Sequence, residues 1–400
     1  MILKFGLKDR DAAARIGEIN INGKKIETPI LLPVVNPNLE YEWIFKEFKI
    51  NAFITNSYIL YKKHREKVEK KGIHKFFNFD GIIFTDSGSF QLMNYGDLDI
   101  TNKEIVEFQE KIKVDIGTFL DIPSKPDKTY EEASRDLEIT ITRGIEALNI
   151  RKNIALNGTI QGGVYKDLRE KAAYEFSKLN FDIHPIGGIV PLMIDYDFET
   201  LVRVFMWAKI VLPSNRPIHA FGVGHPLIMP LLTALGSDIF DSASYSLFAK
   251  EKRYLTPFRT LNLDKMHYLP CSCPICSKYS FKEVKESTRL IEAHNLYMLF
   301  EEIDRIKEYI KEGWLWEYVI IKAHANPNLY RATKWVLENF QRFFWEKDPI
   351  RKRSGIFWQG DWTELRPEIT RAKKRIKERL KREDVPEELK ETFPFGQTVK

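Results

Sequence analysis

Short runs of apolar residues recur along residues 1–250, and most of them end in small or polar side chains. The runs are 52–54, 82–84, 116–120, 154–160, 181–186, 218–221 and 239–240. A short continuous apolar run predicts a strand that is buried on both faces of a parallel sheet. The runs begin about 20 to 40 residues apart, which is the length of a βα unit.

Helical stretches lie between these runs, at residues 130–148, 167–179, 198–211 and 226–235. Seven strand-like segments, with an eighth not yet located, predict an α/β protein built as a (β/α)8 TIM barrel. A doubly wound open sheet is the alternative. Near the N-terminus, residues 16–21 and 24–32 alternate apolar and polar positions around Asn22 and Gly23, which predicts a β-hairpin with a primed two-residue turn.

Two aspartates, Asp86 and Asp241, each follow a predicted buried strand. In parallel α/β folds the carboxyl ends of the strands form the edge where active sites lie. Two carboxylates that face one pocket can divide the roles of nucleophile and acid/base, and a carboxylate nucleophile suits attack at an anomeric carbon. The alternative is structural, because aspartate and serine are ordinary helix N-caps.

Asp121 and Gln161 end two further runs. A carboxylate can accept hydrogen bonds from N1 and the exocyclic amine of a guanine-like base. Gln161, Gly162 and Gly163 offer an amide and N–H groups without Cβ obstruction, which could hold the carbonyl oxygen of such a base. The glycine pair at 187–188 is a second point of close approach. Taken singly, a glycine pair is better explained as a tight turn.

The chain has three cysteines, Cys271, Cys273 and Cys276, and their spacing is typical of metal ligands rather than of disulfides. Three thiolates need a fourth ligand to complete tetrahedral zinc, and His294 on the following amphipathic helix is a better candidate than His267. We expect a structural Zn²⁺ site; free thiols and an iron–sulfur cluster are weaker alternatives. The other histidines are interpreted as packing or hydrogen-bonding residues: His64, His74, His184, His219, His225 and His324.

The net charge of +6 and the pI near 8.9 suggest an acidic partner without identifying it. Basic runs at 62–65, 351–353 and 371–382 could bind phosphate, although the last could equally be a solvated charged helix. The sequence has no signal-like N-terminus and no apolar run of about 18 residues, so we expect a cytoplasmic protein without a membrane partner.

Taken together, the motifs resemble the tRNA-guanine transglycosylase family, and within it the archaeal branch. They cover nearly all of residues 5–325 in order. They are FTDSGSFQL at 84–92, IQGG at 160–163, PIGGIVP at 185–191, FGVGHP at 221–226, FDSASYSLFAK at 240–250, and CSCPIC at 271–276 with HNL at 294–296.

The resemblance implies that Asp241 is the nucleophile, which attacks C1′ of a tRNA nucleotide and expels guanine, and that Asp86 is the acid/base. The positions implied to recognise the base are Ser87, Phe90, Asp121, Gln161, Gly162 and Gly188. In the archaeal branch, 7-cyano-7-deazaguanine replaces guanine at position 15 of the tRNA D-arm, the first step of archaeosine synthesis. The target nucleotide must leave its stack to reach such a pocket.

The resemblance also implies a homodimer with the zinc segment near the subunit contact. It divides the chain into a barrel (1–255 with part of 290–345), a zinc-binding segment (256–300) and a basic C-terminal extension (346–400). Archaeal members often end in a small RNA-binding domain, which this sequence does not show. We therefore expect either a naturally short form served by a separate RNA-binding protein or a shortened chain.

Two other functions remain open from the sequence. The chain could be a non-catalytic subunit of such an enzyme, although the presence of both Asp86 and Asp241 argues against this. It could also be a related transglycosylase that acts on DNA, which the zinc segment and the His225–Pro226 motif disfavour without excluding it. A plain glycoside hydrolase is a more distant alternative, because it would leave Asp121 and Gln161 without a base to read.

Overall fold

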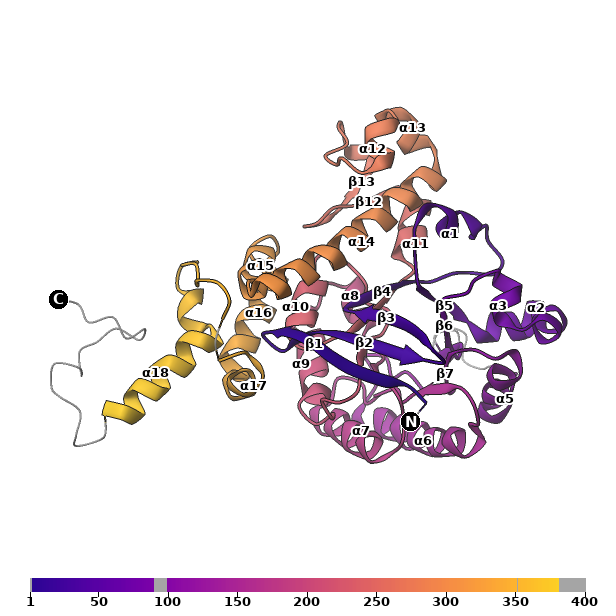
Figure 1. Cartoon of the computed structure of the whole chain (residues 1–400), viewed down its shortest axis with the longest axis horizontal. Helices are drawn as coiled ribbons and strands as arrows, with labels where there is room; N and C mark the ends of the chain where they lie inside the picture. Colours follow the sequence, from indigo (N-terminus) through magenta and orange to yellow (C-terminus); the bar gives the residue numbers. More distant parts are fainter. Residues whose placement is uncertain (1, 90–98, 351, 381–400) are drawn as a thin grey trace.

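The computed structural model describes residues 2–89, 99–350 and 352–380. Figure 1 shows a barrel with a small sheet in front of it, a helical segment that projects at the top, and a C-terminal helical region at the side. Among the described residues, no helix is long and apolar enough to cross a membrane.

Eight parallel strands form the barrel. They are β4 (Ile30–Pro33), β5 (Ala52–Asn56), β6 (Ile82–Asp86), β7 (Ile116–Thr118), β8 (Ala155–Asn157), β9 (His184–Ile186), β10 (Ile218–Ala220) and β11 (Ile239–Ser242). Two four-stranded sheets, β5 to β8 and β9–β10–β11–β4, are joined by bridges between Val34 and Ile54 and between Asn157 and Ile183. The strands therefore follow one another around a closed barrel in chain order. The (β/α)8 prediction is confirmed, and the open sheet is wrong.

The eighth strand comes from the predicted hairpin. The hairpin exists as β2 (Ala14–Ile21) and β3 (Lys24–Thr28), with Asn22 and Gly23 both at positive φ, and β1 (Lys4–Asp11) adds a third antiparallel strand. However, residues 24–32 do not form one arm. Strand β3 ends at Thr28, and β4 then pairs in parallel with β11. The apolar pattern continues across this break, which is why periodicity alone merged the two strands.

The three-stranded sheet closes the barrel at the N-terminal ends of its strands. Ile19, Ile21 and Ile26 from this sheet are buried in one apolar cluster with the inward-facing residues of the barrel, such as Ile82 and Ile239. This packing leaves the opposite end, where the strands finish, as the end at which polar side chains can gather.

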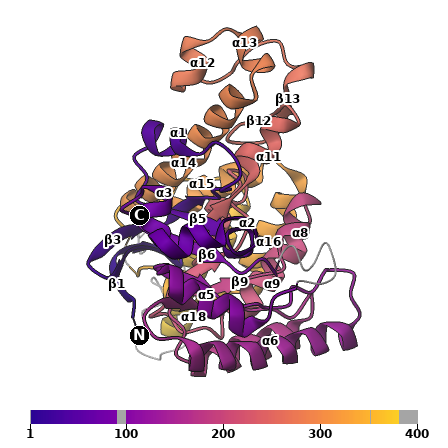
Figure 2. The same cartoon turned by 90° about the vertical axis from the view of Figure 1, so that its right-hand side faces the viewer.

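A layer of helices surrounds the strands and supplies the largest apolar cluster. Figure 2 shows α6 along the lower edge of this layer. The predicted helical stretches are confirmed with small shifts at their ends, except the last, which is shorter than predicted. The helices are α1 (Glu42–Glu47), α2 (Ser57–Lys71), α3 (Ile73–Phe77), α5 (Asn102–Ile112), α6 (Tyr130–Ile150), α7 (Lys166–Lys178), α8 (Val190–Ile194), α9 (Phe198–Lys209), α10 (Met229–Ala234) and α11 (Ser244–Lys250).

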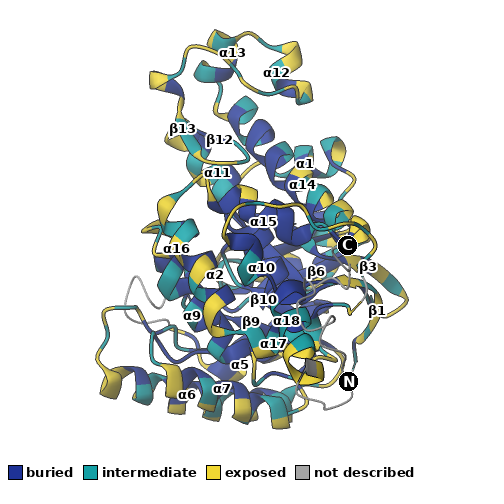
Figure 3. Cartoon of the chain, turned by 90° about the vertical axis from the view of Figure 1, so that its left-hand side faces the viewer, coloured by how far each residue is buried: buried dark blue, intermediate teal, exposed yellow. Residues whose placement is uncertain are grey.

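After α11 the chain leaves the barrel and returns along one long helix. The excursion contains β12 (Arg253–Leu255), β13 (Thr260–Asn262), a 3₁₀ turn η1 (Leu263–Lys265), α12 (Pro274–Lys278) and α13 (Phe281–Glu286). Helix α14 (Thr288–Glu312) brings the chain back; the Ser287 side chain caps its start, and Gly313, at φ +78°, ends it in the left-handed region. In Figures 1 and 3 the excursion stands out from the barrel and carries much exposed surface.

The C-terminal helices are α15 (Leu315–Ala323), α16 (Pro327–Asn339), α17 (Gln341–Lys347) and α18 (Pro367–Leu380), with a 3₁₀ turn η2 (Trp362–Leu365). Buried charges attach this region to the barrel domain. The Lys352 ammonium contacts Asp11 of β1 and lies 3.0 Å from Asp348 and 3.2 Å from Glu368. Arg371, which begins the predicted basic run, is buried and donates to three backbone carbonyls at residues 345–349. Arg371 is therefore a packing residue and not a phosphate ligand.

Candidate active site and metal cluster

Three buried or partly buried carboxylates meet at the C-terminal ends of the barrel strands. Asp86 is the last residue of β6, Asp241 is the next-to-last residue of β11, and Asp121 follows β7. The charges of Asp241 and Asp121 both act on the Asp86 carboxyl, which places the three groups in one site. Within the described ranges, no Lys or Arg forms an ion pair with any of the three, although the half-buried Arg143 contributes some positive charge near Asp121.

Asp241 is held by one of its two carboxylate oxygens. Its Oδ1 accepts a hydrogen bond from the backbone N–H of Gly222 at 2.6 Å and contacts His219 Nε2 at 2.7 Å. Its Oδ2 has no partner among the residues that the structure describes. The first helix after it, α11, has Ala243 as its N-cap and no side-chain cap. Asp241 therefore does not cap this helix, and the structural alternative considered for it is wrong.

Asp86 lies in an environment that favours its protonated form. Burial raises the pKa of Asp86 to about 7; one N–H from Gly88 opposes this, and the charges of Asp241 and Asp121 add to it. The N–H of Gly88 reaches Oδ1 at 2.9 Å. A carboxyl with a pKa near neutrality can both give and take a proton at physiological pH, which suits general acid/base chemistry.

Asp121 is buried and accepts two hydrogen bonds from neutral side chains. Ser89 Oγ donates to Oδ1 at 2.6 Å and Gln161 Nε2 donates to Oδ2 at 2.6 Å. Burial raises the pKa of Asp121, and the two donors only partly offset this. Ser87, also buried, shares a 2.7 Å hydrogen bond with Ser89. The two acceptor atoms of Asp121 are thus prepared for a pair of donors such as those on the edge of a guanine-type base.

The glycine loops after β8 and β9 lie against Gln161. A Cβ on Gly187 would stand 2.4 Å from Gln161 Nε2, and one on Gly188 would stand 2.9 Å from its Oε1. Gly162 and Gly188 also have φ values of +134° and +72°, which L side chains rarely adopt. Space and backbone conformation both require glycine here, which a tight turn explains as well as the close approach of a ligand, so the latter stays a prediction.

The structure brings five of the six predicted base-recognition residues into this site: Ser87, Asp121, Gln161, Gly162 and Gly188. Phe90 lies outside the described residues. Sequence reasoning gave no particular role to His219, which is completely buried against Asp241. A signal was present, because His219 lies at the middle of a strand that neighbours the one carrying Asp241, but only the register of β10 on β11 shows the contact.

The predicted metal ligands form one cluster. The ligand atoms of Cys271, Cys273, Cys276 and His294 all lie within 4.8 Å of one another. Nδ1 of His294 faces the sulfurs of Cys273 and Cys276 at 3.5 and 3.3 Å, while its Nε2 lies 2.9 Å from the Leu255 carbonyl. A backbone acceptor on one ring nitrogen leaves the other free to bind a metal, so the donor set and the surrounding contacts fit a four-coordinate ion.

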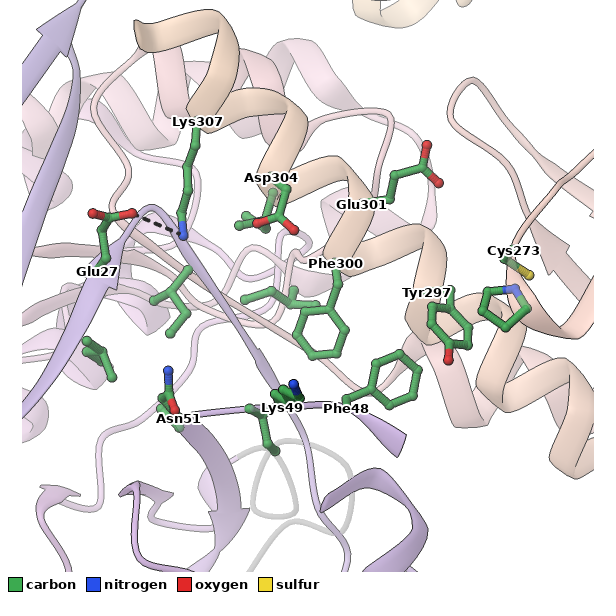
Figure 4. A pocket seen from close by; sticks show the side chains of 17 residues that line it. Glu27, Phe48, Lys49, Asn51, Cys273, Tyr297, Phe300, Glu301, Asp304 and Lys307 are labelled. Carbon is green, nitrogen blue, oxygen red and sulfur yellow. Dashed lines mark ion pairs between the residues drawn. The ribbon is translucent and has the colours of Figure 1, made fainter. Parts of the chain in front are cut away.

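A cavity of about 740 Å³ lies away from the carboxylates, at the N-terminal ends of β4 and β5. Figure 4 shows Tyr297, Phe300 and Lys307 of α14 on one side of it and Phe48 on the other, with Cys273 nearby. Lys307 forms a 3.6 Å ion pair with Glu27 across one end. The cavity contains none of the three rim carboxylates, so it is separate from the candidate active site.

These features define a class of protein: a (β/α)8-barrel enzyme with carboxylates at the C-terminal ends of its strands and, after the last strand, an excursion whose cysteine–histidine cluster could hold a metal ion. Comparison with known proteins identifies the family. The family model described as queuine tRNA-ribosyltransferase matches residues 9–328. The chain therefore belongs to the queuine tRNA-ribosyltransferase family, a family of tRNA-modifying glycosyltransferases.

Similar proteins come from several archaea. The chain is 51% identical to the tRNA-guanine(15) transglycosylase of Nanoarchaeum equitans, over 99% of this chain and 96% of that protein. It is 48% identical to the protein of the same name from Pyrococcus furiosus, over 99% of this chain and 71% of that protein. The corresponding protein of Methanocaldococcus jannaschii is 47% identical, over 96% of this chain and 61% of that protein. The resemblance to the archaeal branch is confirmed.

Proposed function

We propose that this enzyme is a tRNA-guanine(15) transglycosylase, which replaces guanine in the tRNA D-arm by 7-cyano-7-deazaguanine as the first step of archaeosine synthesis. The observation that carries the chemistry is the state of Asp241: one carboxylate oxygen contacts Gly222 and His219, and the other has no partner among the described residues. A fixed carboxylate with one free oxygen suits nucleophilic attack at an anomeric carbon. The names of the archaeal relatives support the choice of position 15.

The first half of the reaction removes guanine. Oδ2 of Asp241 forms a bond to C1′ as the C1′–N9 bond breaks, and the electron pair of that bond passes into the purine. Protonated Asp86 gives its proton to the departing base, which its pKa of about 7 allows. Oδ1 keeps its hydrogen bonds to Gly222 and His219 while it becomes the carbonyl oxygen of the ester.

The second half reverses these roles. Asp86, now ionised, takes the N9 proton of the incoming 7-cyano-7-deazaguanine, and N9 attacks C1′ as the bond to Asp241 Oδ2 breaks. Asp86 is then protonated again and ready for another cycle. Both halves use the same two carboxylates, because one proton is given and one is taken back in each exchange.

Recognition of the base is assigned to Asp121 and the residues around it. Its two oxygens would accept from N1–H and the 2-amino group, in place of the present hydrogen bonds from Ser89 and Gln161. The Gln161 amide would then be released toward the base. Ser87, Gly162 and Gly188 complete the pocket, and Phe90 is expected to stack on the base. Asp121→Ala should weaken base binding while the fold persists, and an unchanged affinity for guanine would refute this role.

The metal cluster is assigned to a structural Zn²⁺ held by Cys271, Cys273, Cys276 and His294. A bound zinc ion cross-links the excursion to α14 and supplies no chemistry at the rim carboxylates. We expect Cys273→Ala to release one zinc per chain and to lower the melting temperature. Elemental analysis and a thermal melt measure both; a protein that keeps its melting temperature without zinc would show that the metal is not structural.

We also propose that the enzyme is a homodimer. The resemblance to the family supports this, and the cavity beside Cys273 and Pro274 places the aromatic side chains of Phe48, Tyr297 and Phe300 next to the zinc segment, among charged residues. Phe300→Lys should then shift the molar mass measured by light scattering from that of two chains to that of one. A single-chain mass for the unaltered protein would overturn the proposal.

The decisive experiment is incorporation of radiolabelled guanine into purified tRNA. Label should enter tRNA that carries guanine at position 15, and neither a tRNA changed at that position nor DNA should be labelled. The assay is run with and without a separate RNA-binding protein, because the resemblance predicts that such a partner helps to expose position 15. Absence of label under both conditions would favour a non-catalytic subunit, and label in DNA would favour the DNA enzyme.

A further inference from the structure

Arg169, in the first turn of α7, is a buried cation without a counter-ion. Its side chain is fully inaccessible to solvent, and no described carboxylate lies within ion-pair distance of it. Burial lowers the pKa of Arg169 to about 9. A buried charge is costly unless it is well hydrogen-bonded, and a cation near a helix N-terminus also opposes the helix dipole. Packing alone therefore does not explain an arginine here.

The guanidinium joins two loops through their backbone carbonyls. Its Nε donates to Gly163 at 2.8 Å, and its Nη1 donates to Ile160 at 2.8 Å and to Gly187 at 2.9 Å. The first two carbonyls flank the pair Gln161 and Gly162 after β8, and the third precedes Gly188 after β9. Arg169 thus fixes, from within the protein, both of the glycine loops that face the carboxylate site.

The hydrogen bond to Gly187 also changes what Gly188 can do. A donor on the carbonyl of a peptide group polarises that group, so its N–H becomes a stronger donor. The N–H of Gly188 belongs to the same peptide group and has no acceptor within the described part of the chain. The remaining nitrogen of Arg169, Nη2, is buried without a partner and lies 3.4 Å from the position of a Cβ on Gly188. Positive charge is therefore concentrated at this loop.

We propose that Arg169 is a positioning residue that strengthens the donors of the glycine loops toward the exocyclic oxygen of a guanine-type base; this rests on the base exchange proposed above. When the C1′–N9 bond breaks, its electron pair spreads over the purine and adds negative charge at that oxygen. Preorganised donors aimed at a site of developing charge stabilise the transition state more than the ground state. Arg169 acts on the base through the Gly187–Gly188 peptide group, without forming a covalent bond.

The test compares a base that has the exocyclic oxygen with one that lacks it. Guanine and 2-aminopurine share the 2-amino group and differ at the exocyclic oxygen and at N1, which carries a hydrogen only in guanine. The N1 contact to Asp121 is the same in the unaltered enzyme and in the Arg169 variants, so the change in preference on substitution reports on the donors that face the oxygen. In Arg169→Gln we expect guanine to lose at least about tenfold in kcat/KM, while the inhibition constant of 2-aminopurine changes little. Arg169→Lys keeps the positive charge but lacks the planar guanidinium that donates to both loops. Its kcat/KM for guanine should lie between those of the unaltered enzyme and Arg169→Gln.

Arg151 provides the matched control. It is largely buried and pairs with Asp182 at 2.8 Å at the other end of the barrel. Arg151→Gln should lower the melting temperature and leave the preference for guanine over 2-aminopurine unchanged. The inference would be overturned if either Arg169 variant bound guanine and 2-aminopurine more weakly by the same factor. It would also be overturned if a variant that still exchanges guanine kept the original preference for guanine over 2-aminopurine. Failure of the unaltered enzyme to exchange guanine would instead refute the proposed function.

Discussion

Two aspartates three residues apart lie at the two ends of strand β11: Asp238 immediately precedes the strand, and Asp241 is its third residue. Each accepts a backbone N–H from the neighbouring strand region: Asp238 from Ile218 at 2.8 Å, and Asp241 from Gly222 at 2.6 Å. They differ in the second partner. Both carboxylate oxygens of Asp238 accept hydrogen bonds from Arg15: Oδ1 from Nε at 2.9 Å and Oδ2 from Nη2 at 2.5 Å.

The second partner of Asp241 is a histidine and not an arginine: His219 lies 2.7 Å from Oδ1, and Oδ2 has no partner in the described part of the chain. A carboxylate bound on both oxygens by a guanidinium is well stabilised and poorly nucleophilic, whereas one fixed through a single oxygen remains available for attack. We infer that aspartates at the two ends of one strand differ in role because of what surrounds them: Asp238 is structural, and Asp241 is the proposed nucleophile.

The difference extends around the barrel. At the closed end, Asp115 accepts the N–H of Ile83 and lies within 3.2 Å of Lys24 and 3.0 Å of His74. Asp182 also accepts a backbone N–H from the preceding strand and pairs with an arginine. Three successive odd-numbered strands of the barrel, β7, β9 and β11, are thus preceded by an acid that has a cationic partner. At the open end, the described donors to Asp86 and Asp121 are all neutral.

The pKa values follow this division. Burial alone would raise the pKa of Asp115, but hydrogen bonds from His74 and Ile83, together with the nearby charge of Lys24, hold it below its usual value. Without such a cation, burial raises the pKa of Asp86 to about 7. Asp115 therefore keeps its charge at neutral pH, while Asp86 can exchange a proton there.

The largest expected effect comes from removing the reactive member of the β11 pair. Asp241→Asn leaves the hydrogen-bonding atoms in place but removes the nucleophile, so guanine exchange should fall by at least about 10³-fold and the covalent enzyme–RNA adduct should disappear. The adduct is measured on a denaturing gel. The melting temperature should stay close to that of the unaltered protein. An adduct that survives the substitution would exclude Asp241 as the nucleophile.

The structural member of the pair should respond in the opposite way. Asp238→Asn leaves Arg15 buried without its counter-ion, which typically costs about 3–5 kcal/mol in the free energy of unfolding. We expect a clear drop in the denaturant midpoint, with kcat at low temperature within about twofold of the unaltered enzyme because Asp238 is remote from the rim. If the exchange reaction were abolished in a variant that is still folded, the proposed separation of the two ends would be wrong.

Local patterns predicted most of the fold. Ser287 and Gly313 mark the ends of α14 because capping depends on the residue itself and its nearest neighbours. The strand at 30–33 was missed, since the alternation of residues 24–32 continues through the point where the chain passes from one sheet to another. Local signals identify elements well and sheet membership poorly.

The sequence predicted those site residues that lie at or just after the C-terminal end of a strand. Asp86, Asp121 and Asp241 each follow an apolar run, and parallel strands bring such positions together. His219 was predicted only as a packing or hydrogen-bonding residue and Arg169 was given no role, because their contacts reach across 22 residues to Asp241 and 18 residues to Gly187. Arg169 in particular lies in a charged helical stretch, where an arginine is ordinarily solvent-exposed. Only the packing of α7 on the two loops shows otherwise.

A smaller effect is expected from substitution of His219, which contacts Asp241. His219→Phe removes the contact at Oδ1 while it keeps an aromatic ring at a buried position, and kcat should fall about 10- to 100-fold. His219→Gln can place an amide donor near the position of Nε2 and should recover part of that loss. A structural role alone would lower the melting temperature of both variants without this recovery in kcat. Equal kcat values in the two variants would contradict the positioning role.

The smallest expected effect is a pH-dependent change in stability at Asp86. The folded-state pKa of about 7 lies above the ordinary value of about 3.9, so the native state binds this proton more tightly than the unfolded chain does. The resulting destabilisation is absent below pH 4, grows as the pH rises, and is complete above pH 7. Asp86→Asn cannot ionise, so it should raise the melting temperature by a few degrees at pH 8 and by almost nothing near pH 4.

Asp115→Asn should instead lower the melting temperature at pH 8. Asp115 has a lowered pKa, so its stabilisation is present above the unfolded-state pKa and is lost as the pH falls through the folded-state pKa. Thermal melts between pH 4 and pH 8 measure the slope for Asp86, and melts continued below pH 4 measure the slope for Asp115. Slopes of the same sign would show that the two ends of the barrel do not treat their carboxylates differently.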